Sequence, residues 1–448
     1  MPTPIAIYND RPTVLMGDAA DHHGGFRVVP LVNGAKHFPV SEWCQADDRF
    51  CWQVDAPAGD YAVTALIHGY DAEVRLTCEG QTLRVAIDDD WDRTDLGTLH
   101  LSAGCHTLTL DAPNTGRDLQ LYSLELIRPA TAERVRREVA AIRADTTWMR
   151  EGLYGLQFHW TSQSQPRHGQ QLPYNEAVAA FDVERFAAMV DEVGAKHVTF
   201  TTSHAEFFFP APIAAIDAIM PGRTSERDLV ADLIAALGAR DIRLMLYYHT
   251  GHDHAPEPDG WWERTGFPAD TGRFVDNWCA QIREVGERYG QGLAGWWFDD
   301  GCVYYPLNPS FFQMGQAAKA GHPGRVVCYN PWIWPRFSDY QDYFCGETYR
   351  FLTETRHLPA DGSGVFSGGP QTGLQAHTNF VLEGYWVHDQ PESPIPPPNV
   401  PLEQFLADSV AAIRRGIVPS FNLEIYQDGG ISPQSRDYLL ALKERVRG

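Results

Sequence analysis

The chain has 448 residues, 44% of them hydrophobic and 21% charged, a composition typical of a globular protein with room for two or three domains. It carries 36 Lys and Arg against 58 Asp and Glu, which gives a formal net charge of -22. Because phosphate binding requires clustered basic side chains, this charge argues against a nucleic-acid partner and leaves a small molecule or an oligosaccharide as the expected one.

The first residues and the cysteines indicate the cellular compartment in which the protein is expected. The opening stretch MPTPIAIYNDRPTV has no basic start followed by an apolar core, so we expect no signal peptide, a cytoplasmic location and no membrane partner. The eight cysteines lack zinc-site spacing and are too sparse for a disulfide scaffold, which predicts mostly buried free thiols and leaves a Cys44–Cys51 bridge open. A homo-oligomer is also compatible with the sequence.

Residues 1–129 form short segments that alternate between apolar and polar positions. The stretches FCWQVDAPAGDYAVTALIHG and AEVRLTCEGQTLRVAI are broken by the turn sequences PAGD and EGQ. Such alternation predicts an antiparallel β-sandwich, which resembles the jelly-roll carbohydrate-binding modules that accompany carbohydrate enzymes. Trp91, in DDDWDRTD, is either a stacking platform for a sugar or an aromatic side chain packed on its own sheet.

From Thr131 the apolar period changes to that of a helix. The stretch TAERVRREVAAIRADTTWMREGL places apolar residues at helical spacing, with Thr131 as the expected N-cap and Glu133 two residues later. We expect residues 130–150 to form a helix that links the sandwich to the rest of the chain.

The remaining residues, 151–448, alternate strand-like and helix-like segments. Apolar runs such as HVTFTTSH, IRLMLYYH and LAGWWFDD alternate with helical patterns, which indicates a parallel sheet covered on both faces. The strands end in polar or aromatic residues and no GxGxxG follows the first one, so a (β/α)8 TIM-like barrel is favoured over an open doubly wound sheet. The proline run Pro391–Pro401 predicts a stiff surface loop near the end of the barrel.

In such a barrel the reactive groups lie where the strands end. Acids, imidazoles and indoles gather at the predicted ends: His159, Trp160, Ser203, His204, Glu206, Tyr248, His249, Asp299, Asp300, Asn330, Glu347 and Glu383. This mixture suits a sugar ring, and two carboxylates across a cleft are the minimum for cleaving a glycosidic bond. Alternation along WWFDD places Trp297 and Asp299 on one face and Asp300 on the other, so only one aspartate points into the barrel mouth.

Residues 147–446 resemble the α-L-fucosidases of glycoside hydrolase family 29 along their whole length. The segment MREGLYGLQFHWTSQSQP is similar to the first barrel strand of that family. The segments FAAMVDEVGAKHVTFTTSHAEFF, RDLVADLIAALGARDIRLMLYYH, WWFDDG and SFNLEIYQDGGISPQSRDYLLALKERV follow in the family's order. The resemblance implies a glycoside hydrolase that needs no cofactor and no metal.

The resemblance also implies roles for particular residues. Asp299 matches the nucleophile and Glu347, in DYFCGE, the acid/base; for both, the alternative is a structural carboxylate. By the resemblance, the substrate-binding residues are expected to be His159, Trp160, His204, Trp297, Asn330 and Trp332. Glu206 and Tyr248 are added to them from their positions at the predicted strand ends. The cluster HTGHDH, residues 249–254, could suggest a metal but lacks the spacing of a known site.

The positions at which this sequence differs from the family bear on which sugar is the substrate. Ala205 stands where the family has a second histidine, and Pro331 interrupts its NDRW stretch, so hydroxyl contacts are lost. The sandwich also precedes the barrel here, whereas in the family it typically follows. We predict a retaining exo-glycoside hydrolase for an α-L-fucosyl group or a related sugar such as an L-galactoside or arabinoside. The alternatives are a non-catalytic carbohydrate-binding protein and a transglycosylase.

Overall fold

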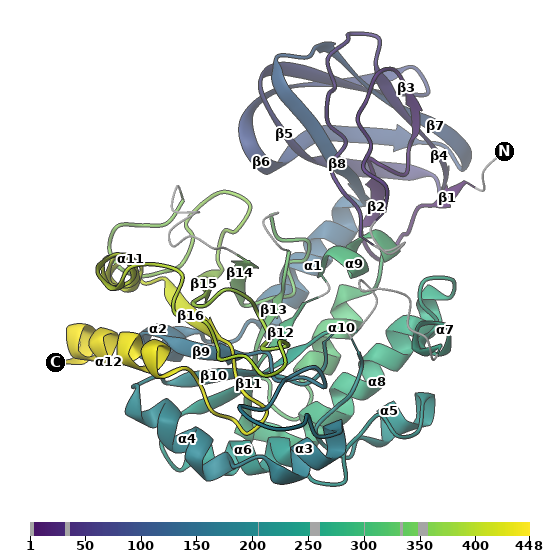
Figure 1. Cartoon of the computed structure of the whole chain (residues 1–448). Coiled ribbons are helices and arrows are strands. Elements are labelled where there is room, and N and C mark those ends of the chain that lie inside the picture. Colours follow the sequence, from purple (N-terminus) through teal and green to yellow (C-terminus); the bar gives the residue numbers. More distant parts are fainter. Residues whose placement is uncertain are drawn as a thin grey trace. The chain divides into compact units, whose positions relative to one another are not determined.

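The computed structural model of the chain describes residues 4–31, 36–204, 206–250, 260–299, 301–331, 335–347 and 357–448 (Figure 1); the side chains of residues 345–347 are outside this set. The chain divides into two compact units. One comprises residues 1–141 with 302–310, and the other comprises residues 142–301 with 311–448.

The first unit is the predicted N-terminal β-sandwich. Its strands are β1 (Ile5–Ala6), β2 (Thr13–Met16), β3 (Asp21–His23), β4 (Arg49–Ala56), β5 (Gly59–Cys78), β6 (Gln81–Leu101), β7 (Gly104–Asn114) and β8 (Arg117–Ile127). Their order is β1-β4-β7-β5-β8-β2, with β3 on β4 and β6 on β5, and all pairs are antiparallel except β1 with β4. Strand β5 pairs with β8 through residues 62–70 and with β7 through residues 73–77, and both ladders contain bulges, so this one strand bends from one neighbour to the other.

The alternation in the sequence builds the core of this unit. Along β7, inward residues such as Leu108 and Leu110 are fully buried while their neighbours reach the surface. Trp91 lies on β6, and its ring stacks on the His68 ring of β5 at a centroid distance of 5.6 Å. The indole of Trp91 therefore packs on its own sheet, which was the second of the two interpretations given for this residue.

The predicted linker helix is two helices, α1 (Pro129–Ile142) and α2 (Thr147–Glu151). The single helix predicted from Thr131 was therefore wrong, and so was its N-cap: the Thr131 hydroxyl donates to the Asn9 carbonyl at 2.7 Å. The chain leaves the helix because the Ala144 N–H donates to the Asp342 carboxylate at 2.7 Å and the Thr147 N–H to the Asp145 carboxylate at 2.9 Å.

The second unit contains the predicted barrel, in which eight parallel strands follow the order β13-β12-β11-β10-β9-β16-β15-β14. The strands are β9 (Gly155–Phe158), β10 (His197–Thr201), β11 (Arg243–Tyr248), β12 (Leu293–Phe298), β13 (Val326–Tyr329), β14 (Tyr343–Glu347), β15 (Gln375–Val381) and β16 (Val418–Leu423). The first strand β9 pairs with the last strand β16, as closure of a barrel requires.

Helices connect the strands and cover the sheet (Figure 1). They are α3 (Tyr174–Ala180), α4 (Val183–Glu192), α5 (Ala214–Ile219), α6 (Leu229–Gly238), α7 (Trp261–Thr265), α8 (Thr271–Tyr289), α10 (Phe311–Ala318), α11 (Leu402–Arg414) and α12 (Pro433–Arg447), with the short turn η1 (Gly290–Gly292). The short helices α9 (Gly301–Tyr304) and η2 (Tyr305–Leu307) fall almost entirely in the segment 302–310 that belongs to the first unit. Asp182, Asp228 and Asp270 cap α4, α6 and α8 by accepting hydrogen bonds from backbone N–H groups in the first turn.

Asp342 joins β13 to the segment that leads into β14. Its buried carboxylate accepts hydrogen bonds from the Val327 N–H at 2.8 Å and from the Lys319 ammonium at 2.5 Å, and its own N–H donates to the Val327 carbonyl at 2.8 Å. Burial lowers the pKa of Lys319, and the Asp342 charge opposes this shift. The two hydrogen bonds between Asp342 and the Val327 backbone therefore tie β13 to the start of β14.

Two further expectations can be compared with the described residues. The cysteines among them, Cys44, Cys51, Cys78, Cys105, Cys279, Cys302 and Cys328, are all free, so the Cys44–Cys51 bridge left open is not formed. None of the helices in the described ranges combines the length and the apolar character needed to cross a bilayer.

Candidate active site

Asp299 follows β12 directly, at the end of the barrel where polar residues follow the strands. Its carboxylate accepts a hydrogen bond from the Asn330 amide at 2.6 Å and another from the Tyr247 hydroxyl. The Asp299 side chain is partly exposed, whereas Tyr247 and Asn330 are almost fully buried. The Asp299 carboxylate therefore lies at the barrel mouth, and a buried side chain donates a hydrogen bond to each of its two oxygens.

The register of the parallel strands explains why these three residues meet. Tyr247 on β11 pairs with Trp297 on β12, which in turn pairs with Cys328 on β13. Side chains alternate along a strand, so the next inward positions on β12 and β13 are Asp299 and Asn330. The backbone continues these ladders, because the Asp299 N–H donates to the Tyr248 carbonyl at 3.1 Å and the Asn330 N–H to the Phe298 carbonyl at 2.8 Å.

Gly301 permits the close approach of the two loops that carry Asp299 and Asn330. A Cβ atom at this position would lie 2.7 Å from the Asn330 carbonyl oxygen, closer than real Cβ atoms come to a backbone atom. The glycine of the WFDDG stretch is therefore required by the backbone of Asn330 rather than by an unusual turn.

A group of aromatic rings surrounds His159, the residue that follows β9. The ring centroid of His159 lies 4.7 Å from that of Tyr247 and 5.3 Å from that of His204, and the His204 and His249 rings are also 5.3 Å apart. Burial lowers the pKa of His159 to about 4, more than a hydrogen bond to Asn422 raises it, and the nearby His249 lowers it further. His159 is therefore a neutral imidazole at neutral pH.

Trp386 adds an indole to this group from the loop that follows β15. Its ring lies 5.1 Å from the His159 ring, and its backbone carbonyl accepts a hydrogen bond from the Asn422 amide at 3.1 Å. Glu424 anchors the loop on both sides of Trp386, because its carboxylate accepts from the Tyr385 N–H at 3.2 Å and contacts His388 Nδ1 at 3.1 Å. The indole is thus held in place by the last barrel strand.

Trp297 lies one layer deeper in the barrel. It is 1% exposed and belongs to a buried cluster with Met245, Tyr247, Cys328 and Tyr343. Its ring centroid is 6.1 Å from that of Tyr247, so it supports the ring whose hydroxyl holds Asp299. The alternation predicted from WWFDD is confirmed for Trp297, which lies inside the barrel, whereas Trp296 and Phe298 stack on each other and Phe298 packs on Trp278 of α8.

The structure does not bring Trp160 and Tyr248 into this group. The Trp160 indole packs on Phe181 and Phe200 and donates to the Gln427 carbonyl at 3.1 Å. The Tyr248 hydroxyl donates to the Gln281 side chain of α8 at 2.7 Å. Both side chains leave their strands on the face opposite to His159 and Tyr247, because each is one position out of phase with the inward set.

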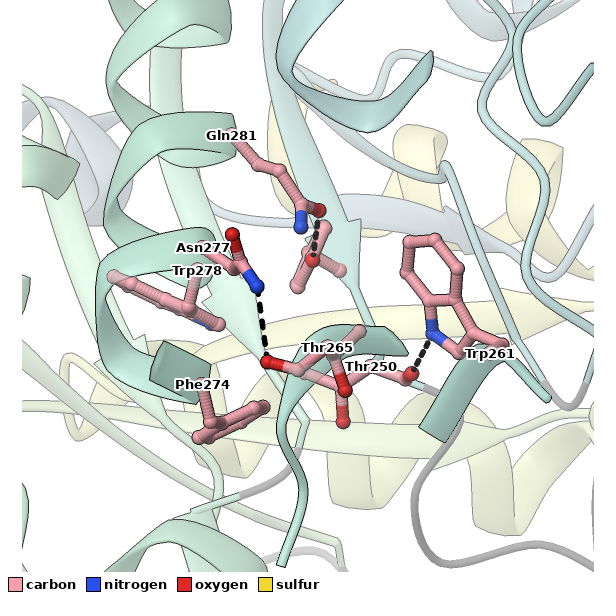
Figure 2. Close-up of a pocket in the computed structure, with 8 residues that line it drawn as sticks. Thr250, Trp261, Thr265, Phe274, Asn277, Trp278 and Gln281 are labelled. Carbon is pink, nitrogen blue, oxygen red and sulfur yellow. Dashed lines mark hydrogen bonds between the residues drawn. The ribbon is translucent and has the colours of Figure 1, made fainter. Parts of the chain in front are cut away.

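Tyr248 instead lines a small cavity outside the barrel, between β11, α7 and α8 (Figure 2). There the Trp261 indole donates to the Thr250 carbonyl at 2.9 Å and the Asn277 amide to the Thr265 carbonyl at 3.0 Å. The polar groups drawn around this cavity bond to one another.

Two more predicted carboxylates occupy other surroundings. Glu206 is exposed and accepts a hydrogen bond from the Ser162 hydroxyl at 2.8 Å, so it lies on the rim and not against Asp299. Glu383 is fully buried, accepts from the Glu424 N–H at 3.1 Å and from the Ser435 hydroxyl in the first turn of α12, and thereby joins strand ends to a helix. Burial raises the pKa of Glu383 to about 8.

Several predictions fall outside the described residues. These are Asp300, Ala205, Trp332 and the side chain of Glu347, together with His252, Asp253 and His254 of the HTGHDH cluster. The backbone of Glu347 is described: it is the last residue of β14 and pairs with Asn379 of β15. The backbone of Glu347 therefore lies at the same end of the barrel sheet as that of Asp299. Across the described ranges, His, Cys, Asp and Glu form no group of three or more that could hold a metal ion.

Three residues at the site were missed by the sequence analysis: Tyr247, Trp386 and Asn422. The sequence alone could not identify Tyr247, because the register that places it in phase with Trp297 and Asp299 is known only from the strand pairing in the structure. Trp386 lies in a loop without a strand pattern, and the inward direction of Asn422 depends on the pairing of β16 with β9.

Comparison with known proteins was made at the level of sequence families and of solved structures. A family model described as Alpha-L-fucosidase matches residues 140–358, which include His159, His204, Asp299 and Asn330. Among curated proteins no match was found.

Solved structures with a similar fold include several fucosidases. A bacterial fucosidase bound to a dihydroxy-methylpyrrolidine inhibitor has a TM-score of 0.50 and 18% identity over 68% of this chain and 74% of that one. A family 29 α-L-fucosidase from Bacteroides thetaiotaomicron, described as a trapped covalent intermediate, has a TM-score of 0.49 and 17% identity over 68% of this chain and 75% of that one. The α-fucosidase of Thermotoga maritima has a TM-score of 0.45 and 18% identity over 68% of this chain and 74% of that one. At these identities the likeness concerns the fold.

Proposed function

We propose that the chain, whose residues 140–358 match the Alpha-L-fucosidase family model, is a retaining exo-acting glycoside hydrolase that removes a terminal α-L-fucosyl group or a sterically related sugar. The observation that carries this proposal is Asp299. Its carboxylate is partly exposed at the barrel mouth and held by Tyr247 and Asn330, and the Tyr247 ring in turn contacts the ring of His159. A carboxylate that accepts hydrogen bonds on both oxygens is oriented for attack on an anomeric carbon.

In the first step, an Asp299 oxygen attacks the anomeric carbon while the bond to the leaving oxygen breaks, and Glu347 gives its proton to that oxygen. In the second step, the Glu347 carboxylate takes a proton from water, whose oxygen attacks the same carbon and releases Asp299. Each step inverts the anomeric centre, so the product retains the configuration of the substrate. No redox change occurs, and no cofactor takes part.

The surrounding residues suit a neutral sugar with several hydroxyl groups. A neutral His159 carries one acceptor and one donor, and the indole of Trp386 offers an apolar face for C–H groups. The departures at Ala205 and Pro331 support a sugar that shares the ring shape of L-fucose but differs at one hydroxyl, such as L-galactose or an arabinose.

The test is hydrolysis of 4-nitrophenyl glycosides (α-L-fucoside, α- and β-galactosides, L- and D-arabinosides) by the wild type and by Asp299→Asn. We expect release from the α-L-fucoside or an arabinoside, and a loss of kcat on the order of 10⁴-fold in the variant. Asp241→Asn is the matched control, because that side chain is 97% exposed and lies at a surface turn; its activity should equal that of the wild type.

The stereochemistry of the first product distinguishes the proposal from its rivals. Proton NMR during hydrolysis should show the substrate's anomer before mutarotation. Formation of the opposite anomer would refute the retaining mechanism. A protein that binds a sugar of the panel without hydrolysing it would instead be the non-catalytic binding protein.

A further inference from the structure

We propose that Asn422 is a positioning residue that fixes the tautomer of His159, so that the Nε2 atom of His159 accepts a hydrogen bond from a hydroxyl of the substrate. This inference rests on the proposed function, because it takes His159 to face the bound sugar. The role of Asn422, a residue of the last barrel strand, is inferred from the hydrogen bonds of its side-chain amide.

The orientation of the Asn422 amide is determined by its two neighbours. Asn422 is fully buried near the end of β16, and its Nδ2 atom lies 3.1 Å from the carbonyl oxygen of Trp386. A carbonyl oxygen only accepts, so the amide nitrogen must face it and the amide oxygen must face the other way. That oxygen lies 2.8 Å from Nδ1 of His159.

The proton on His159 is therefore located. Because Oδ1 of Asn422 only accepts, Nδ1 of His159 must carry the hydrogen. The titratable groups that face the ring are Tyr247 from β11, His204 after β10 and His249 after β11, and the other two neighbours, Trp386 and Asn422, are uncharged. Burial among these groups keeps the ring neutral, which leaves a lone pair on Nε2.

This arrangement has a consequence for specificity. An acceptor at Nε2 selects a substrate group that can donate, such as a hydroxyl, over a group that cannot. A 4-nitrophenyl fucoside in which fluorine replaces the contacted hydroxyl keeps a similar size but cannot donate to Nε2. The three ring hydroxyls can be replaced one at a time to find the one that His159 contacts.

The first experiment is Asn422→Asp, followed by kcat/KM for 4-nitrophenyl α-L-fucoside between pH 4 and 9. A carboxylate beside Nδ1 stabilises the imidazolium, whose Nε2 is a donor and no longer an acceptor. We expect the acid limb of the profile to move up by about two pH units, since an opposite charge beside a titrating group shifts it by that order. Asn379→Asp is the matched control: this fully buried amide of β15 bonds to Gln157 and not to His159.

An equal loss of activity at all pH values in Asn422→Asp would overturn the proposal, because a merely structural role would give that result. An acid limb that moves equally in Asn379→Asp would overturn it as well.

A second measurement does not depend on activity and is made on the wild-type protein. In wild-type protein labelled with ¹⁵N-histidine, the His159 signals, identified by their absence in His159→Gln, should show a protonated Nδ1 and an unprotonated Nε2 at pH 7. A protonated Nε2 would refute the tautomer even in a fully active enzyme. The expected tautomer in a protein without glycosidase activity would instead leave Asn422 correctly assigned and the proposed function wrong.

Discussion

Tyr247 and Tyr248 are adjacent residues whose hydroxyl groups serve different purposes, and this allows a closely matched test of the site. The Tyr247 hydroxyl donates to the Asp299 carboxylate, whereas the Tyr248 hydroxyl donates to Gln281 on the outer face of the barrel. Tyr247→Phe and Tyr248→Phe each remove one oxygen atom and leave the ring packing unchanged. We expect only Tyr247→Phe to affect catalysis.

The magnitude follows from the kind of hydrogen bond that is lost. A bond to a charged group contributes about 1.5–3 kcal/mol, and about 1.4 kcal/mol corresponds to a tenfold change in rate. Asp299 keeps the Asn330 donor in Tyr247→Phe, so its carboxylate is still held by one oxygen but can rotate. We therefore expect kcat to fall about 10- to 100-fold, with KM changed by less than about threefold, because the orientation of the nucleophile is affected more than substrate binding.

Tyr248→Phe should behave in the opposite way. Its kcat should stay within about twofold of the wild type, while urea denaturation should show a loss of about 1 kcal/mol because the Gln281 oxygen is left without this donor. Initial rates on the substrate identified by the glycoside panel, together with unfolding curves, provide both readouts. The reasoning would be refuted if Tyr248→Phe lost activity while Tyr247→Phe retained it, since the inward and outward faces of β11 would then be exchanged.

Two further predictions concern stability. Asp342→Ala removes the acceptor for two backbone N–H groups and for the buried Lys319 ammonium, so it should cost at least about 3 kcal/mol by urea denaturation, and Asp342→Asn should cost less; equal stability of wild type and Asp342→Ala would contradict the role given to this residue. The pKa of Glu383 is raised to about 8 by burial, above that of an unfolded glutamate, so the stability that this group contributes is present in full below about pH 4.5 and is lost as the pH rises to 8. Glu383→Gln should therefore flatten the fall of unfolding free energy between pH 5 and 8, and an unchanged slope would contradict the shifted pKa.

The barrel and the sandwich could be predicted because their signals are local. Buried strands such as β12 are continuous apolar runs, and helices such as α4, α6 and α8 begin at aspartates that cap them. The position of Asp299 at the barrel mouth could be predicted for the same reason, since it directly follows a buried strand, whereas its role as the nucleophile came from the family resemblance and stays a prediction. The break between α1 and α2 could not be found in this way, because Asp342 binds Ala144 from 198 residues away.

The choice between Tyr247 and Tyr248 shows a second limit. Both follow the same apolar run, and the phase of a strand relative to its neighbour is set by the register of the sheet, which a single sequence does not contain. Once Tyr247 is paired with Trp297, alternation alone assigns the inward positions of β11, β12 and β13. The register was thus the missing information, and one correct pair would have been sufficient.

The hydrogen bonds of His159 link the proposed selection of substrate hydroxyl groups to the pairing of the first and last barrel strands. His159 follows the first strand and Asn422 lies on the last, and they meet because β9 pairs with β16, with Gln157 opposite Asn422. A slip of this pairing by one residue would turn Asn422 away from His159 and leave the Nδ1 proton without its acceptor. The same slip would remove the amide that holds the Trp386 carbonyl. On the proposal that Asn422 fixes the tautomer of His159, variants that weaken β9–β16 pairing should lose discrimination between sugars before they lose the barrel.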